Sequence, residues 1–107
     1  MTTTQTDRIR ALNDDLRQHL IGGGAVITPG IAALGQEAID RIVKTIAVYG
    51  AFCHDNDPYG EHDFGAFEAD GKTIFFKIDL YEGPEVKSGN GEPVVTRVLT
   101  IMLAEEY

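Results

Sequence analysis

The stretch DNDPYGEHDFG, residues 55–65, gathers four carboxylates and one histidine within eleven residues. Side chains of these types serve in three kinds of site. They ligate metal ions, act as general acids and bases, or attract partners of opposite charge. The same stretch contains a proline and two glycines, which are typical of turns.

A metal site is the first interpretation of this stretch. Asp55, Asp57 and Gly60 match the opening of a calcium-binding loop, with ligands at its first and third positions and a glycine at the sixth. The match then ends, because Tyr59 occupies the fifth position and Ala66 the twelfth, where a bidentate glutamate is needed. A transition-metal site could instead recruit Asp55, Asp57, His62 and Asp63. We keep that site as an alternative and otherwise expect no cofactor.

Catalysis is the second interpretation. Glu61, His62 and Asp63 supply an acid, a base and an orienting carboxylate, and Cys53 beside His54 could form a thiol–imidazole pair. These residues are neighbours on one short loop, whereas catalytic partners usually come from separate elements that fix their geometry. We therefore assign no catalytic residue. A small metal-binding or histidine-assisted enzyme centred on this loop is the alternative function.

Turn chemistry is the third interpretation. Asp and Asn side chains hydrogen-bond their own backbone, Pro58 fixes one φ angle, and Gly60 permits a positive one. This interpretation explains the residue types, but it does not explain the amount of charge.

Negative charge is concentrated in the middle third of the chain. The 107 residues carry a net charge of −8, and residues 55–85 hold nine acids and two lysines, a net charge of −7. Contacts to phosphate need clustered lysine and arginine, so direct nucleic-acid binding is disfavoured and a basic protein surface is favoured. Aromatic side chains alternate with these acids, so we predict a partner-binding surface made of Asp55, Asp57, Tyr59, Glu61, His62, Asp63, Phe64, Glu68, Phe75, Asp79 and Tyr81.

Two predicted helices precede this surface. The first begins at Thr6, and its apolar stripe consists of Ile9, Leu12, Leu16 and Leu20. The second covers residues 35–49, with a buried stripe of Ile39, Ile42, Val43 and Ile46.

Strands dominate the rest of the sequence. Asp70-Gly71 between apolar runs predicts a hairpin of residues 64–69 and 72–81. Residues 82–91 are predicted to form a polar loop, residues 94–104 a last strand, and residues 25–28 a fourth strand. The expected fold is one α+β domain over residues 1–107, with two N-terminal helices packed on a three- to four-stranded antiparallel meander.

The sequence also bears on localisation. It has no apolar run of the length that spans a membrane, and its polar N-terminus lacks the apolar core of a secretory signal. Its single cysteine cannot form an internal disulfide. We expect a cytoplasmic protein with no membrane partner.

Two long segments, DNDPYGEHDFGAFEADGKTIFFKIDLYE and VTRVLTIMLAEEY, closely resemble an uncharacterised family of small bacterial proteins. It is a domain-of-unknown-function family that is often carried on mobile elements. The resemblance covers the loop, the hairpin and the last strand, and extends more loosely to VITPGIAALG. It implies no established activity, so it transfers no catalytic residue.

The mobile-element setting implies an inhibitor of host defence, of the anti-CRISPR or antirestriction type. A small acidic protein of that kind acts as a nucleic-acid mimic and occupies a basic groove in place of the phosphate backbone. We therefore predict a non-enzymatic acidic binding protein that docks on a basic protein surface, including that of a nucleic-acid-binding effector complex. A homodimer formed through an exposed edge strand or the aromatic face is a further prediction.

Overall fold

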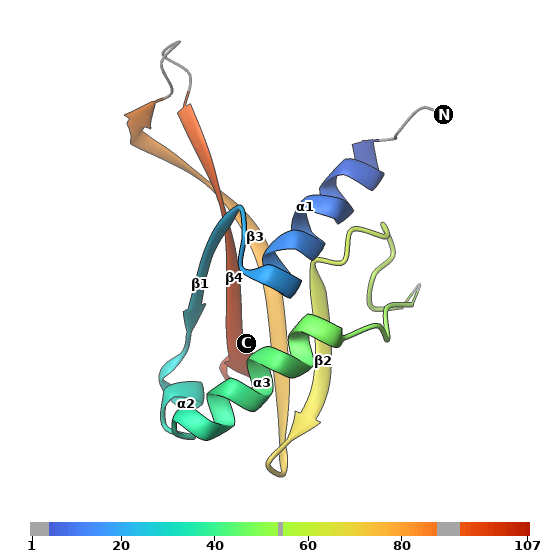
Figure 1. The fold of residues 1–107 in the computed structure, drawn as a ribbon, viewed down its shortest axis with the longest axis vertical. Helices are drawn as coiled ribbons and strands as arrows, with labels where there is room; N and C mark the ends of the chain where they lie inside the picture. The colour runs from blue at the N-terminus through green and yellow to red at the C-terminus, as the bar shows by residue number, and fades with distance from the viewer. Residues whose placement is uncertain (1–4, 54, 88–92) are drawn as a thin grey trace.

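The computed structural model of the protein describes residues 5–53, 55–87 and 93–107. Figure 1 shows the α-helices in front of a twisted sheet. The elements, in chain order, are α1 (Gln5–His19), β1 (Gly23–Ile27), α2 (Pro29–Ala32), α3 (Gln36–Val48), β2 (Phe64–Ala69), β3 (Lys72–Lys87), β4 (Pro93–Leu103) and the 3-10 helix η1 (Ala104–Glu106). The predicted α+β class is confirmed.

The four strands are ordered β1-β4-β3-β2. Antiparallel pairing joins β2 to β3 and β3 to β4, but β1 runs parallel to β4. The sheet is therefore mixed, and the expectation of a wholly antiparallel sheet is wrong. The reason is the path of the chain, because α2, α3 and the hairpin lie between β1 and β4 and allow the two strands to run in the same direction.

The hairpin has the predicted register, with Ala69 opposite Lys72 and Phe67 opposite Ile74. Its return strand is longer than predicted. Residues 82–87, expected to lie in a loop, continue β3, and a register shift marks the pairing with β4 between Gly83 and Lys87. A proline within this segment is tolerated where the ladder is irregular. Part of the predicted loop, residues 88–92, lies outside the described residues.

All three helices contribute to a core on one face of the sheet. The buried side chains of this core are Leu16, Ile31, Ile42, Ile46, Ile74, Phe76, Ile78, Leu99, Ile101 and Leu103. Gly65 of β2 is part of this packing, because a Cβ there would lie 2.3 Å from the Phe76 ring and 2.8 Å from that of Tyr49. The opposite side of the sheet, which we call the open face, is left uncovered by α1, α2 and α3.

The two longer helices fit their predicted patterns unequally. α3 buries Ile42 and Ile46 as expected. In α1, only Leu16 of the predicted stripe is buried, Leu12 and Leu20 are about half exposed, and Asn13 and Arg17 are buried instead. The expected apolar stripe of α1 is therefore wrong in detail. Thr6, predicted to begin this helix, lies one residue inside its described part, which begins at Gln5.

Candidate functional site

The carboxylate of Asp57 organises the acidic loop, residues 55–63, by accepting hydrogen bonds from the loop backbone. Its Oδ1 accepts a hydrogen bond from the Glu61 N–H at 3.0 Å, and its Oδ2 accepts one from the His62 N–H at 3.2 Å. Gly60, with a φ of 68°, closes the turn by donating its N–H to the Asp57 carbonyl. Asp57 is only 7% exposed. Turn chemistry thus accounts for Asp57, which does not face a partner.

Helix α1 holds the backbone of the same loop. Arg10 Nε donates to the Gly60 carbonyl at 2.6 Å, and Asn13 Nδ2 donates to the Glu61 carbonyl at 2.9 Å. Loop carbonyls that would otherwise need water are thereby satisfied. Asn13, on the polar side of α1, is therefore buried against the loop.

His62 is fixed by three neighbours. Its Nδ1 lies 2.9 Å from Asp14 Oδ1, its Nε2 lies 3.9 Å from Asp57 Oδ2, and its ring stacks on Phe52 with centroids 4.0 Å apart. The backbone of His62 has a φ of 55°, a left-handed conformation that residues other than glycine rarely adopt. These contacts hold the backbone in that conformation.

Arg17 connects this arrangement to the end of α3. Its Nη1 donates to the carbonyls of Ile46 at 2.7 Å and Tyr49 at 2.9 Å, at the end of the helix. The Ile46 carbonyl also accepts the Tyr49 N–H at 3.2 Å. Its Nη2 lies 2.9 Å from Asp14 Oδ1, and its guanidinium lies 5.2 Å from the centre of the Phe52 ring. One buried cation therefore joins α1 to the end of α3 and to Phe52, and shares the Asp14 carboxylate with His62.

These contacts bear on the two alternative interpretations. Asp57 and His62 are engaged within the fold, Asp55 is exposed, and the described residues contain no group of three or more His, Cys, Asp or Glu side chains arranged to hold a metal ion. Cys53 is exposed, while His54, its proposed thiol–imidazole partner, lies outside the described residues. The geometry of the loop therefore gives no specific support to a metal site or to a catalytic centre.

The second half of the loop opens onto a hollow of about 280 Å³, which we call the acidic hollow. Glu61, Asp63 and Asp79 line it together with Arg97, whose Nε donates to Asn13 Oδ1 at 2.7 Å. Burial raises the pKa of the Asp63 carboxyl, and so do the nearby charges of Asp57 and Asp79. Three residues of the predicted surface thus share one site.

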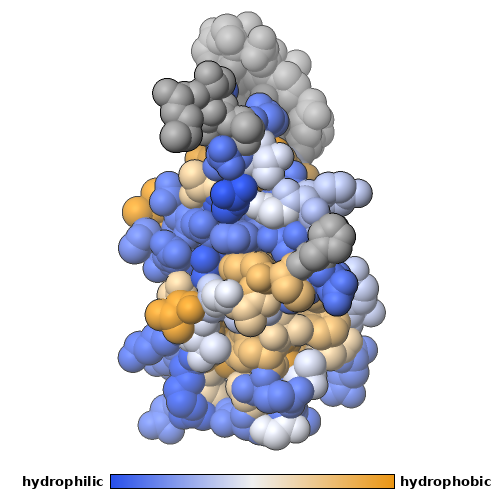
Figure 2. All heavy atoms as spheres, turned by 90° about the vertical axis from the view of Figure 1, so that its right-hand side faces the viewer, coloured by the Kyte–Doolittle hydropathy of each residue, from blue (hydrophilic) through white to orange (hydrophobic). Residues whose placement is uncertain are grey.

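The open face carries an aromatic cluster of Phe64, Phe75 and Tyr107. The ring centroids lie 5.2 Å apart for the two phenylalanines, and those of Tyr107 lie 6.3 and 5.7 Å from them. Tyr107 is 77% exposed. Figure 2 shows apolar surface on the side of the molecule that bears β2, bordered by hydrophilic residues. The cluster begins at Phe64, directly after Asp63 of the acidic hollow.

A family model described as "Protein of unknown function (DUF3768)" matches residues 27–106. The chain belongs to the DUF3768 family. The predicted membership of an uncharacterised family is therefore confirmed, while the mobile-element setting stays a prediction. No curated protein and no solved structure matches the chain. Within the part of the chain that the structure describes, no helix is long and apolar enough to cross a membrane.

The match to the DUF3768 family includes the acidic loop and strands β2 to β4, and it begins after α1. In this member of the family, α1 nevertheless supplies Arg10, Asn13 and Asp14 to the loop, and Arg17 to Asp14 and the end of α3. The spacing of these four residues, at intervals of three and four, was a signal in the sequence for a polar contact face.

The other predicted residues are dispersed. Tyr59 and Tyr81 are exposed at 78% and 52%. Glu68 accepts a hydrogen bond from the Thr73 hydroxyl at 2.6 Å. Asp79 of the acidic hollow also lies 3.2 Å from the Lys77 ammonium, and this hydrogen bond raises the pKa of Lys77. Sequence reasoning missed Tyr107, which reaches the cluster because η1 turns the chain after β4.

Tyr107 owes its place to a second set of contacts at the end of the chain. The Glu106 carboxylate accepts hydrogen bonds from the Thr28 hydroxyl at 2.5 Å and the Gly30 N–H at 3.0 Å. These hydrogen bonds lower the pKa of Glu106. They tie η1 to the segment before α2.

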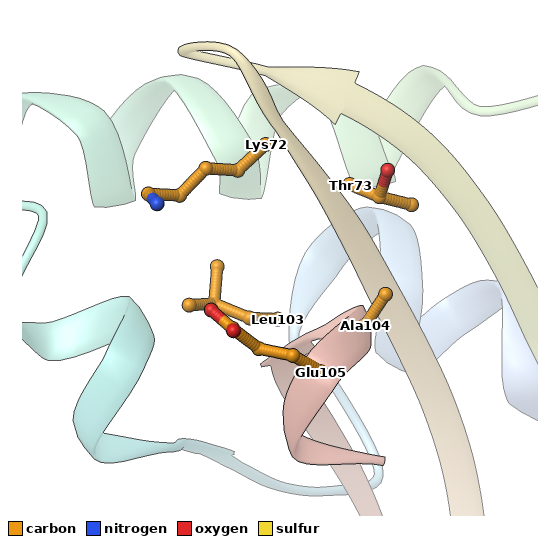
Figure 3. Close-up of a pocket in the computed structure, with 5 residues that line it drawn as sticks. All are labelled: Lys72, Thr73, Leu103, Ala104 and Glu105. Carbon is orange, nitrogen blue, oxygen red and sulfur yellow. The ribbon is translucent and has the colours of Figure 1, made fainter.

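A separate hollow of about 220 Å³ lies beside the hairpin turn (Figure 3). In the picture, Lys72 and Glu105 extend in the same direction with Leu103 between them, and Thr73 points away. It contains no residue of the predicted surface, and its one cation and one anion offset each other. We assign it no role in binding.

Proposed function

We propose that the chain is a non-enzymatic binding protein that docks on a basic protein surface through the acidic hollow and the adjoining aromatic cluster. The observation that carries this proposal is the meeting of three carboxylates at one hollow, with the aromatic cluster beginning at Phe64, the residue after Asp63. A surface of this composition steers a cationic partner by charge and anchors it by apolar contact.

The electrostatics of the hollow favour an incoming cation. Glu61, Asp63 and Asp79 line it with Arg97, and Lys77 pairs with Asp79 at 3.2 Å. Three carboxylates against two cations leave one negative charge in excess. The raised pKa of Asp63 shows that its ionised form is disfavoured where it stands. The main cause is burial of the carboxyl, and the charges of Asp57 and Asp79 add to it. A lysine or arginine from a partner would stabilise the ionised form through a charge-assisted hydrogen bond.

The aromatic cluster supplies the apolar part of the interface. Phe64 and Phe75 are only partly exposed and pack edge to face, whereas Tyr107 projects from the surface. Aromatic residues that are held in place lose little conformational entropy on binding and are common among residues that dominate binding energy. The cluster therefore suits the apolar stems of basic side chains as well as apolar groups.

The predicted residues take two roles in this proposal. Glu61, Asp63 and Asp79 would contact the partner, together with Phe64 and Phe75. Asp57 and His62 are positioning residues, because their contacts shape the loop that presents Glu61 and Asp63.

Nucleic-acid-handling defence complexes are the partner class we propose first. Their phosphate-binding grooves are rich in lysine and arginine, and a chain with a net charge of −8 is complementary to them. Duplex DNA should then compete with the chain for the captured partner. If DNA does not compete with the chain for a captured basic partner, the proposed docking surface still stands. The proposed partner class is then contradicted.

The docking surface is tested by affinity capture from a lysate of the source cells with three baits. These are the native chain, a variant with Glu61→Lys and Asp63→Lys in the hollow, and a control with Asp15→Lys and Glu37→Lys on exposed helical positions. Both variants change the net charge equally. We expect a basic protein to be captured by the native chain and the control, and to be lost with the hollow variant.

Circular dichroism and a thermal melt establish that each bait is folded. Equal capture by all three baits would contradict the proposed surface, as would equal loss from both charge-reversed baits. The absence of any basic protein among the captured ones would contradict the proposed partner chemistry.

A further inference from the structure

Strand β1 forms one edge of the sheet, and all five of its residues are exposed. The Thr28 N–H donates to the Ile101 carbonyl of β4 at 3.1 Å. Because successive residues of a strand direct their backbone groups to opposite sides, Val26 also faces β4, while Gly23, Ala25 and Ile27 face outward. Their N–H and C=O groups are available to another strand.

This edge has none of the usual protection against pairing. Natural edge strands carry charges, prolines or bulges that prevent another chain from adding to them. Residues 20–28 read LIGGGAVIT and contain no charged side chain and no proline. The other edge strand, β2, contains Glu68 and is followed directly by Asp70. The two edges of the sheet therefore differ in their capacity to pair.

The charge of the chain points to what can occupy the β1 edge. Two copies with a net charge of −8 each repel one another over most of their surfaces. The neutral segment of residues 20–28 is a place where two copies can meet without opposing carboxylates. An antiparallel pair centred on Ala25 is also self-complementary, because Gly23 then faces Ile27 of the second copy and the reverse pair is identical.

An apolar hollow of about 260 Å³ adjoins the same edge on the helical face of the sheet. Its lining residues are Arg17, Leu20, Ala25, Ile27, Val43, Ile46, Leu99 and Ile101. Leu20, Ile21 and Ile27 are 40–60% exposed beside it. A second copy paired as above keeps its helices on the same face and places its Gly23 opposite the exposed Ile27, at the rim of this hollow. Pairing would thus cover apolar surface as well as satisfy backbone groups.

We propose that two copies of this chain associate through antiparallel pairing of their β1 strands about Ala25, which joins two four-stranded sheets into one of eight strands. This pairing lies at the opposite edge of the sheet from β2, whose Phe64 belongs to the aromatic cluster. It does not depend on the proposed docking function.

Sedimentation and light scattering over a range of concentrations measure the mass of the native chain and of two variants. Ala25→Glu places two carboxylates opposite each other at the centre of the pair, which disfavours a strand pair. Ala66→Glu is the matched control, because Ala66 is also exposed but lies in the other edge strand, β2. We expect twice the monomer mass of 11.7 kDa for the native chain and for Ala66→Glu, and the monomer mass for Ala25→Glu.

Hydrogen exchange of the native chain provides a test that needs no variant. The N–H groups of Ala25 and Ile27 should become protected as concentration rises, while that of Val26, bonded to β4, should be protected throughout. A native chain that is monomeric at all concentrations would overturn the proposal. A dimer that survives Ala25→Glu in a folded protein, or that is lost with Ala66→Glu, would also overturn it. Ala66→Glu also places a charge on the open face. Its effect in the affinity-capture experiment therefore tests the docking proposal, separately from the dimer.

Discussion

Helices α1 and α3 pack on the same face of one sheet but contribute differently. α3 places Ile42 and Ile46 in the core, and its contacts are those of an ordinary amphipathic helix. α1 places Leu16 in the core and buries Asn13 and Arg17 beside it. The comparison shows that α3 stabilises the sheet, whereas α1 also shapes the acidic loop through side-chain hydrogen bonds.

The largest expected effect comes from removing the buried cation of α1. Arg17→Met should cost about 3 kcal/mol, because the Ile46 and Tyr49 carbonyls and the Asp14 carboxylate lose their charged donor. Chemical denaturation measures the loss. Arg8→Met, at an exposed position of the same helix, is the control and should change stability little.

Ile46→Ala in α3 tests whether a loss of stability by itself disturbs the geometry of the acidic loop. It should cost a similar amount, about 3 kcal/mol, through the cavity it leaves. Only Arg17→Met should also change the NMR signals of His62, whose Asp14 partner it shares. If both variants disturb His62 equally in the folded state, α1 has no special role in shaping the loop.

The sequence alone predicted α3 and the hairpin well, because both follow strong local rules. Apolar spacing placed Ile42 and Ile46, and Asp70-Gly71 fixed the register of β2 on β3. The buried face of α1 was not predictable in the same way. Its leucines recur at helical spacing, but so do its polar residues, and only the partners brought by the fold decide which set is buried.

The direction of β1 and the position of Tyr107 were also beyond local reasoning. A strand of five residues pairs in parallel or antiparallel according to the path of the chain and not its own composition. For the candidate site, the sequence indicated which segment carries the charge. It could not show that Asp57 turns inward while Asp79 joins Glu61 and Asp63 from another strand.

A smaller effect should follow from the loop's internal carboxylate. Asp57→Ala should cost about 2 kcal/mol, because the N–H groups of Glu61 and His62 lose a charged acceptor in a buried position. Asp55→Ala, at an exposed position of the same loop, should cost far less. Thermal melts of the two variants measure the difference. Equal melting temperatures would mean that Asp57 does not organise the loop. The buried Asp57 and the exposed Asp55 would then not differ in their contribution to stability.

The smallest effect concerns Asp63, at the open end of the loop, and it has the opposite sign. Its pKa is raised in the folded state by burial and by neighbouring acids, so ionisation opposes folding. The stability it costs is absent at low pH and develops as the pH rises from the ordinary value of 3.8 through the raised pKa. Asp63→Asn should therefore melt slightly higher than the native chain at neutral pH and equally in acid. Asp55→Asn, its exposed control, should follow the native chain throughout. A lower melting temperature for Asp63→Asn at neutral pH would show that this carboxylate is a structural anchor like Asp57, and that the loop offers no unsatisfied negative charge to a partner.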